Sequence, residues 1–202
     1  MKDKIQKKMV ALDTDEPIWE HVFMVHPLIV VGTREPDGSY NFSPKHMAMP
    51  LGWQNYFGCI GTPQHRTYHN IVRERVFTVS FPNPEQVVSA SLTATARNAR
   101  DHKPILDTLP TIPAQEIDGA FLKDSYLCLE CELERIIDGF GEHCLIAARI
   151  VAAHAQECAL RGHEKDDNDI VFNTPLLGYL HPGRCASIRE SYAFPFPTHF
   201  KR

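Results

Sequence analysis

The fold of this chain is decided by residues 27–82, which read PLIVVGTREPDGSYNFSPKHMAMPLGWQNYFGCIGTPQHRTYHNIVRERVFTVSFP. Apolar runs of strand length alternate there with turn residues, mainly glycine and proline. Residues 28–33 form a near-continuous apolar run, as in a buried strand, and residues 39–43 are the expected returning strand. Between them, Glu-Pro-Asp-Gly at 35–38 places proline second and glycine fourth, which is typical of a type I β-turn. The stretch therefore begins with a predicted hairpin.

The second half of this stretch predicts two more strands and a short helix. Residues 55–61 have the composition of a strand, with glycines near both ends, and residues 75–81 alternate along a strand pattern. A helix over 69–75 joins them. Thr67 is its expected N-cap, because a threonine hydroxyl can accept from the free N–H groups of the first turn.

Three places near these strands lack a regular pattern. Pro44 has no backbone N–H and is expected to end strand pairing. Residues 47–53 are apolar but predicted to be irregular. Residues 18–24 are apolar-rich and fit either a first strand or a short helix.

Beyond residue 82 the chain begins a helix with a recognisable start signal. Asn83, Pro84 and Gln86 predict an N-cap, a proline at the first helical position and a capping box. A helix of small residues over 87–95 follows. Residues 98–119 are polar and rich in proline, so we expect a surface excursion there.

The remaining pattern is a long hairpin. Residues 125–136 alternate, with Leu129 and Cys131 on one face and Glu130 on the other. Residues 138–139 are the expected turn, and residues 143–153 return as the second strand. Short final elements are expected at 175–181 and 184–188. Several strands with two inserted helices predict a mainly β fold, a β-barrel with helical additions.

Composition limits the class of protein. The 202 residues fit a single domain over 1–202, and 43% hydrophobic with 23% charged residues predicts a packed core. A formal net charge of -4 disfavours nucleic acid as a partner. No apolar run approaches the roughly 20 residues that span a bilayer, and the N-terminus lacks a secretory apolar segment. We therefore expect a cytoplasmic protein with no membrane partner and with its six cysteines reduced.

The sequences of the two chain ends lack the strand pattern of the middle. Residues 1–16 are predicted to be a solvated, partly helical leader. Residues 190–202 form an aromatic and proline-rich tail, a candidate cover for an apolar groove on this chain or on a neighbouring subunit.

The strongest chemical signal is His65-Arg66-Thr67 at a predicted helix start. A helix start offers unpaired N–H groups and the positive end of the dipole. Thr67 adds a hydroxyl, Arg66 a bidentate guanidinium and His65 a further donor, which together suit a phosphate monoester. The alternative is that Thr67 only caps the helix and Arg66 is solvated; the sequence alone leaves both open.

A second candidate site lies in residues 41–49. Asn41 and Ser43 occupy alternate strand positions, and Lys45 and His46 add donors beside an apolar Met-Ala-Met segment. A flat heteroaromatic ring with a polar edge would suit such a lining. The alternative is a solvated loop after a strand.

The sequence shows no complete motif for a metal site or a nucleotide site. Cys128 and Cys131 are three apart in a strand and should point to opposite faces, so no shared metal is expected. His65 and His69 are four apart but lack the glutamate of a zinc-protease helix. No dinucleotide fingerprint, Walker loop or GxSxG elbow is present. His143 lies near a hairpin turn, either as a proton donor or as a turn histidine that faces water.

The ordered motifs resemble a family. PLIVVGT, DGSYNFSP, HRTYHNI and FTVSFPNPEQ, followed by LECELERIIDGFGEHCLIAARIV, are similar to the flavin reductase-like FMN-binding split-barrel proteins. The resemblance covers residues 27–154, plus PLLGY near Leu177. It implies a six-stranded split β-barrel of the FMN-binding type, usually a homodimer with FMN near the interface.

The resemblance also implies roles for individual residues. One group would line the isoalloxazine and ribityl chain, namely Asn41, Phe42, Ser43, Pro44, Lys45, His46 and Met47. Cys59, Ile60 and Gly61 would flank the cofactor from the next strand. The phosphate would be held by Arg66, Thr67 and Asn70, with His65 assisting. His143 matches the family's Gly-Asp-His histidine, but Glu142 replaces the aspartate, and Ala147 and Ala148 stand where many reductases carry a glycine.

Two classes of function follow from the resemblance. In the first, the protein is an FMN-dependent oxidoreductase that takes a hydride from NAD(P)H and passes electrons to free flavin, oxygen or another small-molecule acceptor. His143 would assist protonation. In the second, it is a non-catalytic FMN-binding protein or electron carrier. A third hypothesis, heme binding, rests only on the number of histidines.

Overall fold

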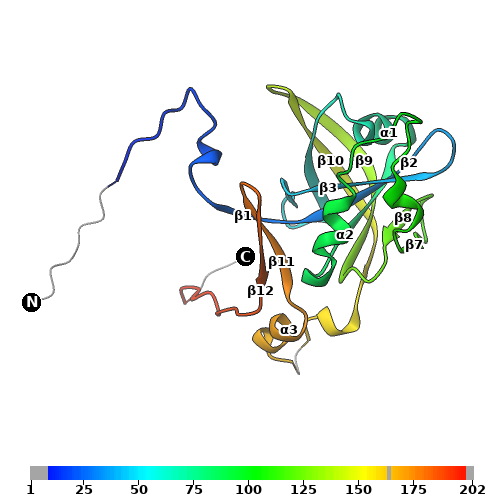
Figure 1. Ribbon diagram of the computed structural model, residues 1–202. Coiled ribbons are helices and arrows are strands. Elements are labelled where there is room, and N and C mark those ends of the chain that lie inside the picture. The colour runs from blue at the N-terminus through cyan, green and yellow to red at the C-terminus, as the bar shows by residue number, and fades with distance from the viewer. Residues whose placement is uncertain (1–8, 163–164, 199–202) are drawn as a thin grey trace, which may run out of the picture.

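The computed structural model describes residues 9–162 and 165–198, and its main element is a seven-stranded antiparallel sheet in the order β3-β2-β6-β9-β10-β5-β4 (Figure 1). Its strands are β2 (Ile29–Arg34), β3 (Tyr40–Lys45), β4 (Ala48–Pro50), β5 (Tyr56–Gly61), β6 (Val76–Phe81), β9 (Leu127–Phe140) and β10 (His143–Ala155). β3 and β4 lie at opposite edges of this sheet, although only His46 and Met47 separate them in the chain. Such a short connection requires the sheet to curl round on itself, which makes a split barrel.

Smaller elements surround the barrel. A three-stranded sheet joins β1 (Met24–Pro27), β11 (Leu176–His181) and β12 (Arg184–Ile188), and a two-stranded ribbon joins β7 (Thr111–Pro113) to β8 (Ala120–Leu122). The helices are α1 (Arg66–Glu74), α2 (Val87–Leu92) and α3 (Asp167–Asn173), with short 3-10 turns at Ile18–Glu20, Pro84–Gln86, Pro104–Asp107 and Glu157–Ala159. Among the described residues, no helix has the length and apolar character that crossing a bilayer requires.

The core explains the continuous apolar run of β2. Ile29 and Val31 point into the main cluster inside the barrel, whereas Val30 packs in a second cluster on the other face. This second cluster includes Ala90 of α2 and Leu122 of β8. Because β2 is covered on both faces, its sequence has no polar alternation.

The main strands of the sequence prediction are confirmed. β2, the turn at 35–38 and β3 form the expected hairpin, in which the Gly38 N–H donates to the Glu35 carbonyl at 3.0 Å. β5, β6, β10, β11 and β12 also fall where they were expected, and the capping box of Asn83 and Gln86 is present. The main sheet has seven strands where six were expected, and the split-barrel class holds.

Two local predictions on β3 and the segment after it were wrong. Pro44 does not end pairing, since β3 continues with Pro44 opposite Val30 and Lys45 opposite Ile29. A proline is tolerated there because β3 is an edge strand, whose outward positions need no N–H donor. Residues 47–53, expected to be irregular, contain the short strand β4.

The helix after β5 begins earlier than predicted. α1 starts at Arg66 and not at residue 69, so its N-cap is His65 and Thr67 lies in the first turn. Thr67 is therefore not the cap.

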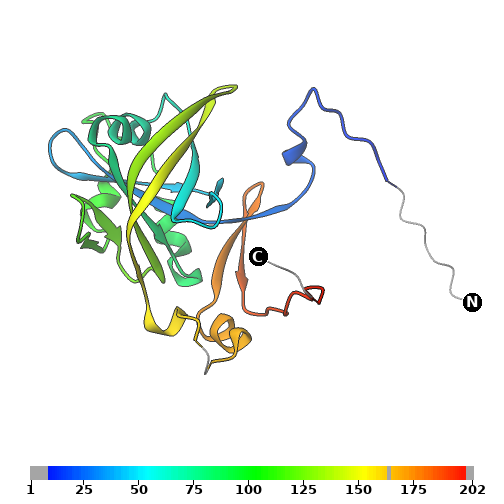
Figure 2. The same cartoon turned by 180° about the vertical axis from the view of Figure 1, so that it is seen from behind.

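The turn of the long hairpin was also misplaced. β9 continues to Phe140, and the turn falls at Gly141 and Glu142. Asp138 and Gly139 form a bulge, because Phe140 pairs with His143 while Ile137 pairs with Leu145. Gly139 adopts a positive φ of 104° there. Figure 2 shows the resulting hairpin of β9 and β10 as a long ribbon across the back of the body.

The chain ends fit the expectations only in part. The leader prediction for residues 1–8 and the tail prediction for residues 199–202 lie outside the described residues. Residues 9–16 contain no helix, and the first helical turn begins at Ile18. This N-terminal segment extends away from the barrel (Figure 1). The start of the tail lies against α3, where the Ser191 N–H donates to Asn168 at 3.0 Å.

Candidate functional site

A polar cleft of about 390 Å³ opens between β3, the N-terminus of α1 and the chain after α2. Seven residues that the sequence assigned to cofactor binding line it: Asn41, Ser43, Pro44, Lys45, His65, Arg66 and Thr67. The alternation of β3 explains part of this set. Asn41, Ser43 and Lys45 share one face of the strand, while Phe42 on the other face is buried in the second core cluster.

The N-terminus of α1 reaches this cleft without a side-chain cap. His65, the N-cap residue, makes no capping hydrogen bond through its side chain. The first-turn N–H groups of a helix have no partner within the helix, and they attract anions. Since Arg66 and Thr67 line the cleft, this end of α1 is available to an anionic ligand.

Two buried side chains connect β3 to α1. The Asn41 amide nitrogen donates to the Thr67 hydroxyl oxygen at 3.4 Å, and both residues are almost fully buried. The Thr67 hydroxyl accepts this bond and keeps its own proton to donate. Thr67 is therefore placed as a hydrogen-bond donor toward the cleft.

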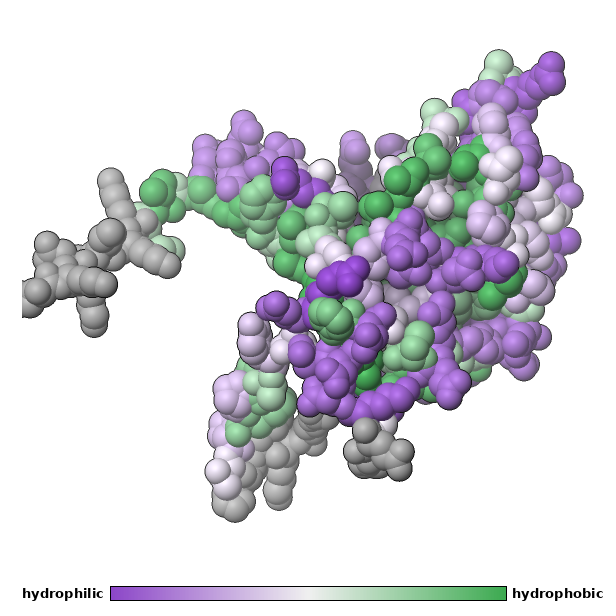
Figure 3. Space-filling view, turned by 60° about the horizontal axis from the view of Figure 1, so that its bottom comes forward, coloured by the Kyte–Doolittle hydropathy of each residue, from purple (hydrophilic) through white to green (hydrophobic). Residues whose placement is uncertain are grey.

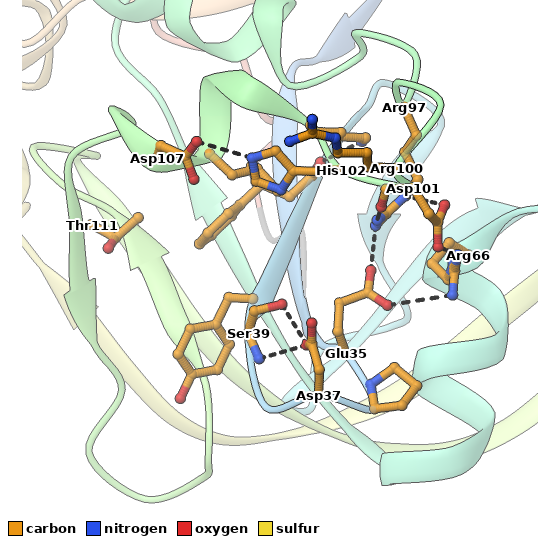
Figure 4. Close-up of a pocket in the computed structure, with 15 residues that line it drawn as sticks. Glu35, Asp37, Ser39, Arg66, Arg97, Arg100, Asp101, His102, Asp107 and Thr111 are labelled. Carbon is orange, nitrogen blue, oxygen red and sulfur yellow. Dashed lines mark hydrogen bonds and ion pairs between the residues drawn. The ribbon is translucent and has the colours of Figure 1, made fainter.

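A network of four charged residues lines a neighbouring cavity of about 600 Å³ (Figure 4), and its two arginines also line the cleft. Arg66 forms ion pairs with Asp101 and, at 3.8 Å, with Glu35. Arg97 pairs with the second oxygen of Glu35 and lies 3.8 Å from Asp101. Glu35 is only 5% exposed, so its charge depends on these two guanidinium groups. An anion that binds Arg66 must compete with Asp101.

Sequence reasoning missed Arg97 and Lys103 as site residues. Arg97 donates to the Asn41 side-chain oxygen at 3.1 Å and so fixes the orientation of that amide. The Lys103 ammonium donates to the Phe42 carbonyl at 3.2 Å and the Thr93 carbonyl at 2.9 Å. The only signal for either residue was the cluster of cations at the start of the polar excursion and just before it. Glu35 was read only as a turn residue.

The electrostatics of the cleft are dominated by positive charge. Burial lowers the pKa of the Lys45 ammonium, and the nearby thiols of Cys59 and Cys144 oppose this shift. Burial also lowers the pKa of His65, and the charges of Lys45, His143 and Lys103 lower it further. His65 is therefore neutral near pH 7. The same interaction places His143, an exposed residue at the start of β10, within electrostatic range of the cleft.

Several sequence-predicted residues lie outside the cleft lining. His46 and Met47 form the connection between β3 and β4, and the His46 ring packs on Tyr179 with centroids 4.4 Å apart. Asn70 is fully buried, and its amide nitrogen donates to the Thr33 hydroxyl at 3.1 Å. Its side-chain oxygen is buried and has no partner in the described part of the chain.

The β5 residues are also absent from the cleft lining. Cys59 is 1% exposed in the main core, and burial raises the pKa of its thiol to about 12. Ile60 and Gly61 pair with Leu145 and Cys144 of β10. Within residues 9–162 and 165–198, no group of three or more potential ligands is arranged to hold a metal.

The curled sheet, with a cleft between its edge strand and the uncapped start of a helix, defines a split-barrel protein. The model of the flavin reductase like domain family matches residues 22–180 of the chain. The chain therefore belongs to the flavin reductase-like family. A search of the curated proteins found no match.

Solved structures share this fold at low sequence identity. The 2-nitrobenzoate 2-nitroreductase of Pseudomonas fluorescens is 18% identical, with a TM-score of 0.77, and the match covers 96% of this chain and 99% of that one. An FMN-binding protein from Thermus thermophilus, with bound 1-cyclohex-2-enone, is 21% identical over 93% and 99% of the two chains, with a TM-score of 0.74. The flavoredoxin of Desulfovibrio vulgaris is 19% identical over 95% and 98%, with a TM-score of 0.74. These likenesses establish the fold.

Proposed function

We propose that the chain is an FMN-binding oxidoreductase of the flavin reductase-like type. The observation that carries this proposal is the uncapped N-terminus of α1, where Arg66 and Thr67 share one cleft with Asn41, Ser43 and Lys45 of the edge strand. A phosphate monoester at the helix end and a polar chain along β3 would use both halves of this lining. The FMN-binding protein and the flavoredoxin among the structural neighbours add support.

The donor set fits FMN. The Thr67 hydroxyl and the first-turn N–H groups offer hydrogen bonds to a phosphate, and Arg66 offers charge once Asp101 is displaced. Lys45 is half-buried and has no carboxylate partner in the described part of the chain. An anion beside it would therefore offset the free-energy cost of burying the ammonium charge. The buried oxygen of Asn70 is a free acceptor one turn further along α1.

The protein residues position the ligand and control protons. Arg97 holds Asn41, and Asn41 in turn orients the Thr67 hydroxyl. The chemistry that FMN supplies when bound is the acceptance of a hydride from NAD(P)H and the transfer of electrons to free flavin, oxygen or another small molecule. His143, exposed at the hairpin turn within electrostatic range of His65, is the residue we assign to proton donation.

A second candidate function is that of an FMN-binding protein or electron carrier without nicotinamide turnover. Glu142 and the buried Ala147 and Ala148 of β10 favour it, because the reductase pattern has an aspartate and a glycine at these positions. In this case the cleft would hold FMN in the same way, and only the reductant would differ.

The exposed apolar surface supports association of two copies. The segment before β1 carries exposed Trp19, Val22 and Phe23, and β1 begins with Met24 and Val25, which are also exposed. Figure 3 shows hydrophobic surface along this projecting arm. We propose a homodimer in which the arm is covered by the second copy, with FMN near the contact.

The visible spectrum of the purified protein tests the function. We expect two broad flavin bands after addition of FMN and removal of free cofactor, and bleaching of these bands by NADH or NADPH without oxygen. Bands that persist with both nicotinamides would favour the carrier. A Soret band would indicate heme, and the absence of retained flavin would contradict the proposal.

A further inference from the structure

A second pocket adjoins the proposed cofactor cleft. It has a volume of about 400 Å³, within the range of small-molecule sites, and it shares Pro44, Lys45 and Ala94 with the cleft. Its other walls come from α2 and from the hairpin of β11 and β12. A ligand in this pocket would therefore lie next to whatever occupies the cleft.

The charge of this pocket is one-sided. Lys45 and Arg184 line it, and no aspartate or glutamate does. In the described part of the chain, neither side chain has a hydrogen bond or an ion pair, and the groups that shift the pKa of Lys45 include no carboxylate. The neighbouring 600 Å³ cavity differs, because two of its arginines, Arg66 and Arg97, pair with Asp101 and Glu35. Two cations without acidic partners select for an anion.

The remaining walls are apolar and aromatic. Leu28 and Val87 contribute apolar surface, and the rings of His46 and Tyr179 pack at 4.4 Å with an angle of 32°. Burial, together with His181, His26 and Lys45, lowers the pKa of His46 to about 4, so its ring is neutral near pH 7. This lining suits a flat ring.

Tyr179 adds a hydrogen-bond donor. Its hydroxyl oxygen accepts from the Gly183 N–H at 3.0 Å, in the turn between β11 and β12. Within residues 9–162 and 165–198, the hydroxyl proton is given to no acceptor. It remains available to a ligand oxygen.

We propose that this pocket binds a small planar aromatic carboxylate, recognised by Arg184 and Lys45 through its charge and by Tyr179 and His46 through its ring. This rests on the proposed function, since the pocket adjoins the cleft that would hold the flavin. Arg184 is the specificity residue, because its planar guanidinium matches a carboxylate and it lines this pocket but not the cofactor cleft.

The test uses the full chain loaded with FMN and titrated with benzoate, which is a carboxylate without a reducible substituent. The readouts are the perturbation of the flavin spectrum and the heat of binding. We expect saturable benzoate binding, and at least tenfold weaker binding of benzamide, which has the same ring without the charge.

Variants at two arginines of the same region locate the site. Arg184→Ala is expected to weaken benzoate about tenfold, the lower part of the range for a charge-assisted bond, because Arg184 is exposed. Arg189→Ala removes the same charge just after β12, outside the pocket lining, and is expected to leave the affinity unchanged. FMN affinity should stay the same in both variants.

Three outcomes would overturn the inference. They are equal binding of benzoate and benzamide, equal loss of benzoate in both arginine variants, and displacement of benzoate by inorganic phosphate at similar concentration, which would mean a general anion site. If the protein fails to retain FMN, the proposed function fails instead, and calorimetry of benzoate with the cofactor-free chain still decides the pocket.

Discussion

Arg97 connects residues that are far apart in the sequence. Its guanidinium pairs with Glu35 after β2 and donates to Asn41 of β3, which itself donates to Thr67 of α1. The side chains that would meet a phosphate are thus oriented by a residue outside the helix that carries them. Such a chain of hydrogen bonds fixes one arrangement, because each bond restricts the next group.

The phosphate assignment gives the first prediction at the level of single residues. Replacing both Arg66 and Thr67 by alanine should weaken FMN binding by about 2–4 kcal/mol, because one charge-assisted and one neutral hydrogen bond are lost. Quenching of flavin fluorescence during titration measures the change. His69→Ala, on the exposed side of the same helix, is the control. Unchanged FMN affinity in the double variant would mean that the phosphate lies elsewhere.

Glu130 gives the second prediction. Its fully buried carboxylate accepts from the N–H groups of Gln115, Glu116 and Ile117 at 2.7–3.0 Å and from His154 at 2.8 Å. Glu130→Gln should cost about 1.5–3 kcal/mol of unfolding free energy, because charge-assisted bonds are replaced by weaker ones. Urea unfolding at pH 7 measures it. Glu132→Gln, on the exposed surface of β9, should change the unfolding free energy little.

The contribution of Glu130 to the free energy of unfolding depends on pH. Burial alone would raise the pKa of Glu130, but the four hydrogen bonds outweigh it and lower the pKa below the usual 4.5. A lowered pKa in the folded state means that the stabilisation is complete above pH 4.5 and is lost as the pH falls through the folded-state value. The difference between wild type and Glu130→Gln should therefore shrink on acidification below pH 4.5. A difference that grows would contradict this account of Glu130.

At the level of elements, the packing of β2 against β6 and β8 requires a glycine. A Cβ on Gly32 would lie 2.3 Å from the Thr78 hydroxyl and 2.6 Å from the Ala120 carbonyl, which are hydrogen-bonded to each other at 2.6 Å. Gly32→Ala should destabilise the fold by about 1–3 kcal/mol, the usual cost of overpacking. Thermal unfolding measures this. Gly162→Ala, with no described atom within 4 Å, is the matched control, and equal melting temperatures would refute the argument.

Most strands could be predicted from the sequence because the order of apolar and polar side chains along a strand indicates which of its faces are buried. β2 reads as a continuous apolar run because both of its faces are covered, and β9 alternates because one face packs in the barrel. The misplaced turn at Asp138 and Gly139 has a physical cause. Gly139 supplies a positive φ, which a bulge needs as much as a turn does, and the sequence does not distinguish them.

The site was less predictable, because its parts meet only in three dimensions. Thr67 and Asn41 were found because each stands in a local motif. Arg97 and Lys103 reach the cleft from an irregular segment that has no periodic pattern. Glu130 was placed with the polar face of β9, but the segment 115–117 folds over Glu130 and buries it. A pattern on one strand contains no information about a segment that covers it.

At the level of the whole molecule, the proposed dimer is open to direct measurement. Light scattering after size exclusion should give twice the 22.9 kDa chain mass. Phe23→Ser with Val25→Ser should shift the equilibrium toward single chains, because exposed apolar area on the arm would be lost from the contact. Val88→Ser, equally exposed on α2, is the control. A wild-type mass of one chain would reject the dimer.

The two edge strands of the main sheet affect how readily the folded protein aggregates in a concentrated solution. An exposed strand edge is a template on which other chains can add strands and grow into fibrils. Here one edge is β3, interrupted by Pro44, and the other is β4, only three residues long and closed by Pro50. Proline has no N–H to donate to an incoming strand, and a three-residue strand can form only a few backbone hydrogen bonds with it. A barrel that is split, and so has two free edges, is in this way protected against aggregation at both.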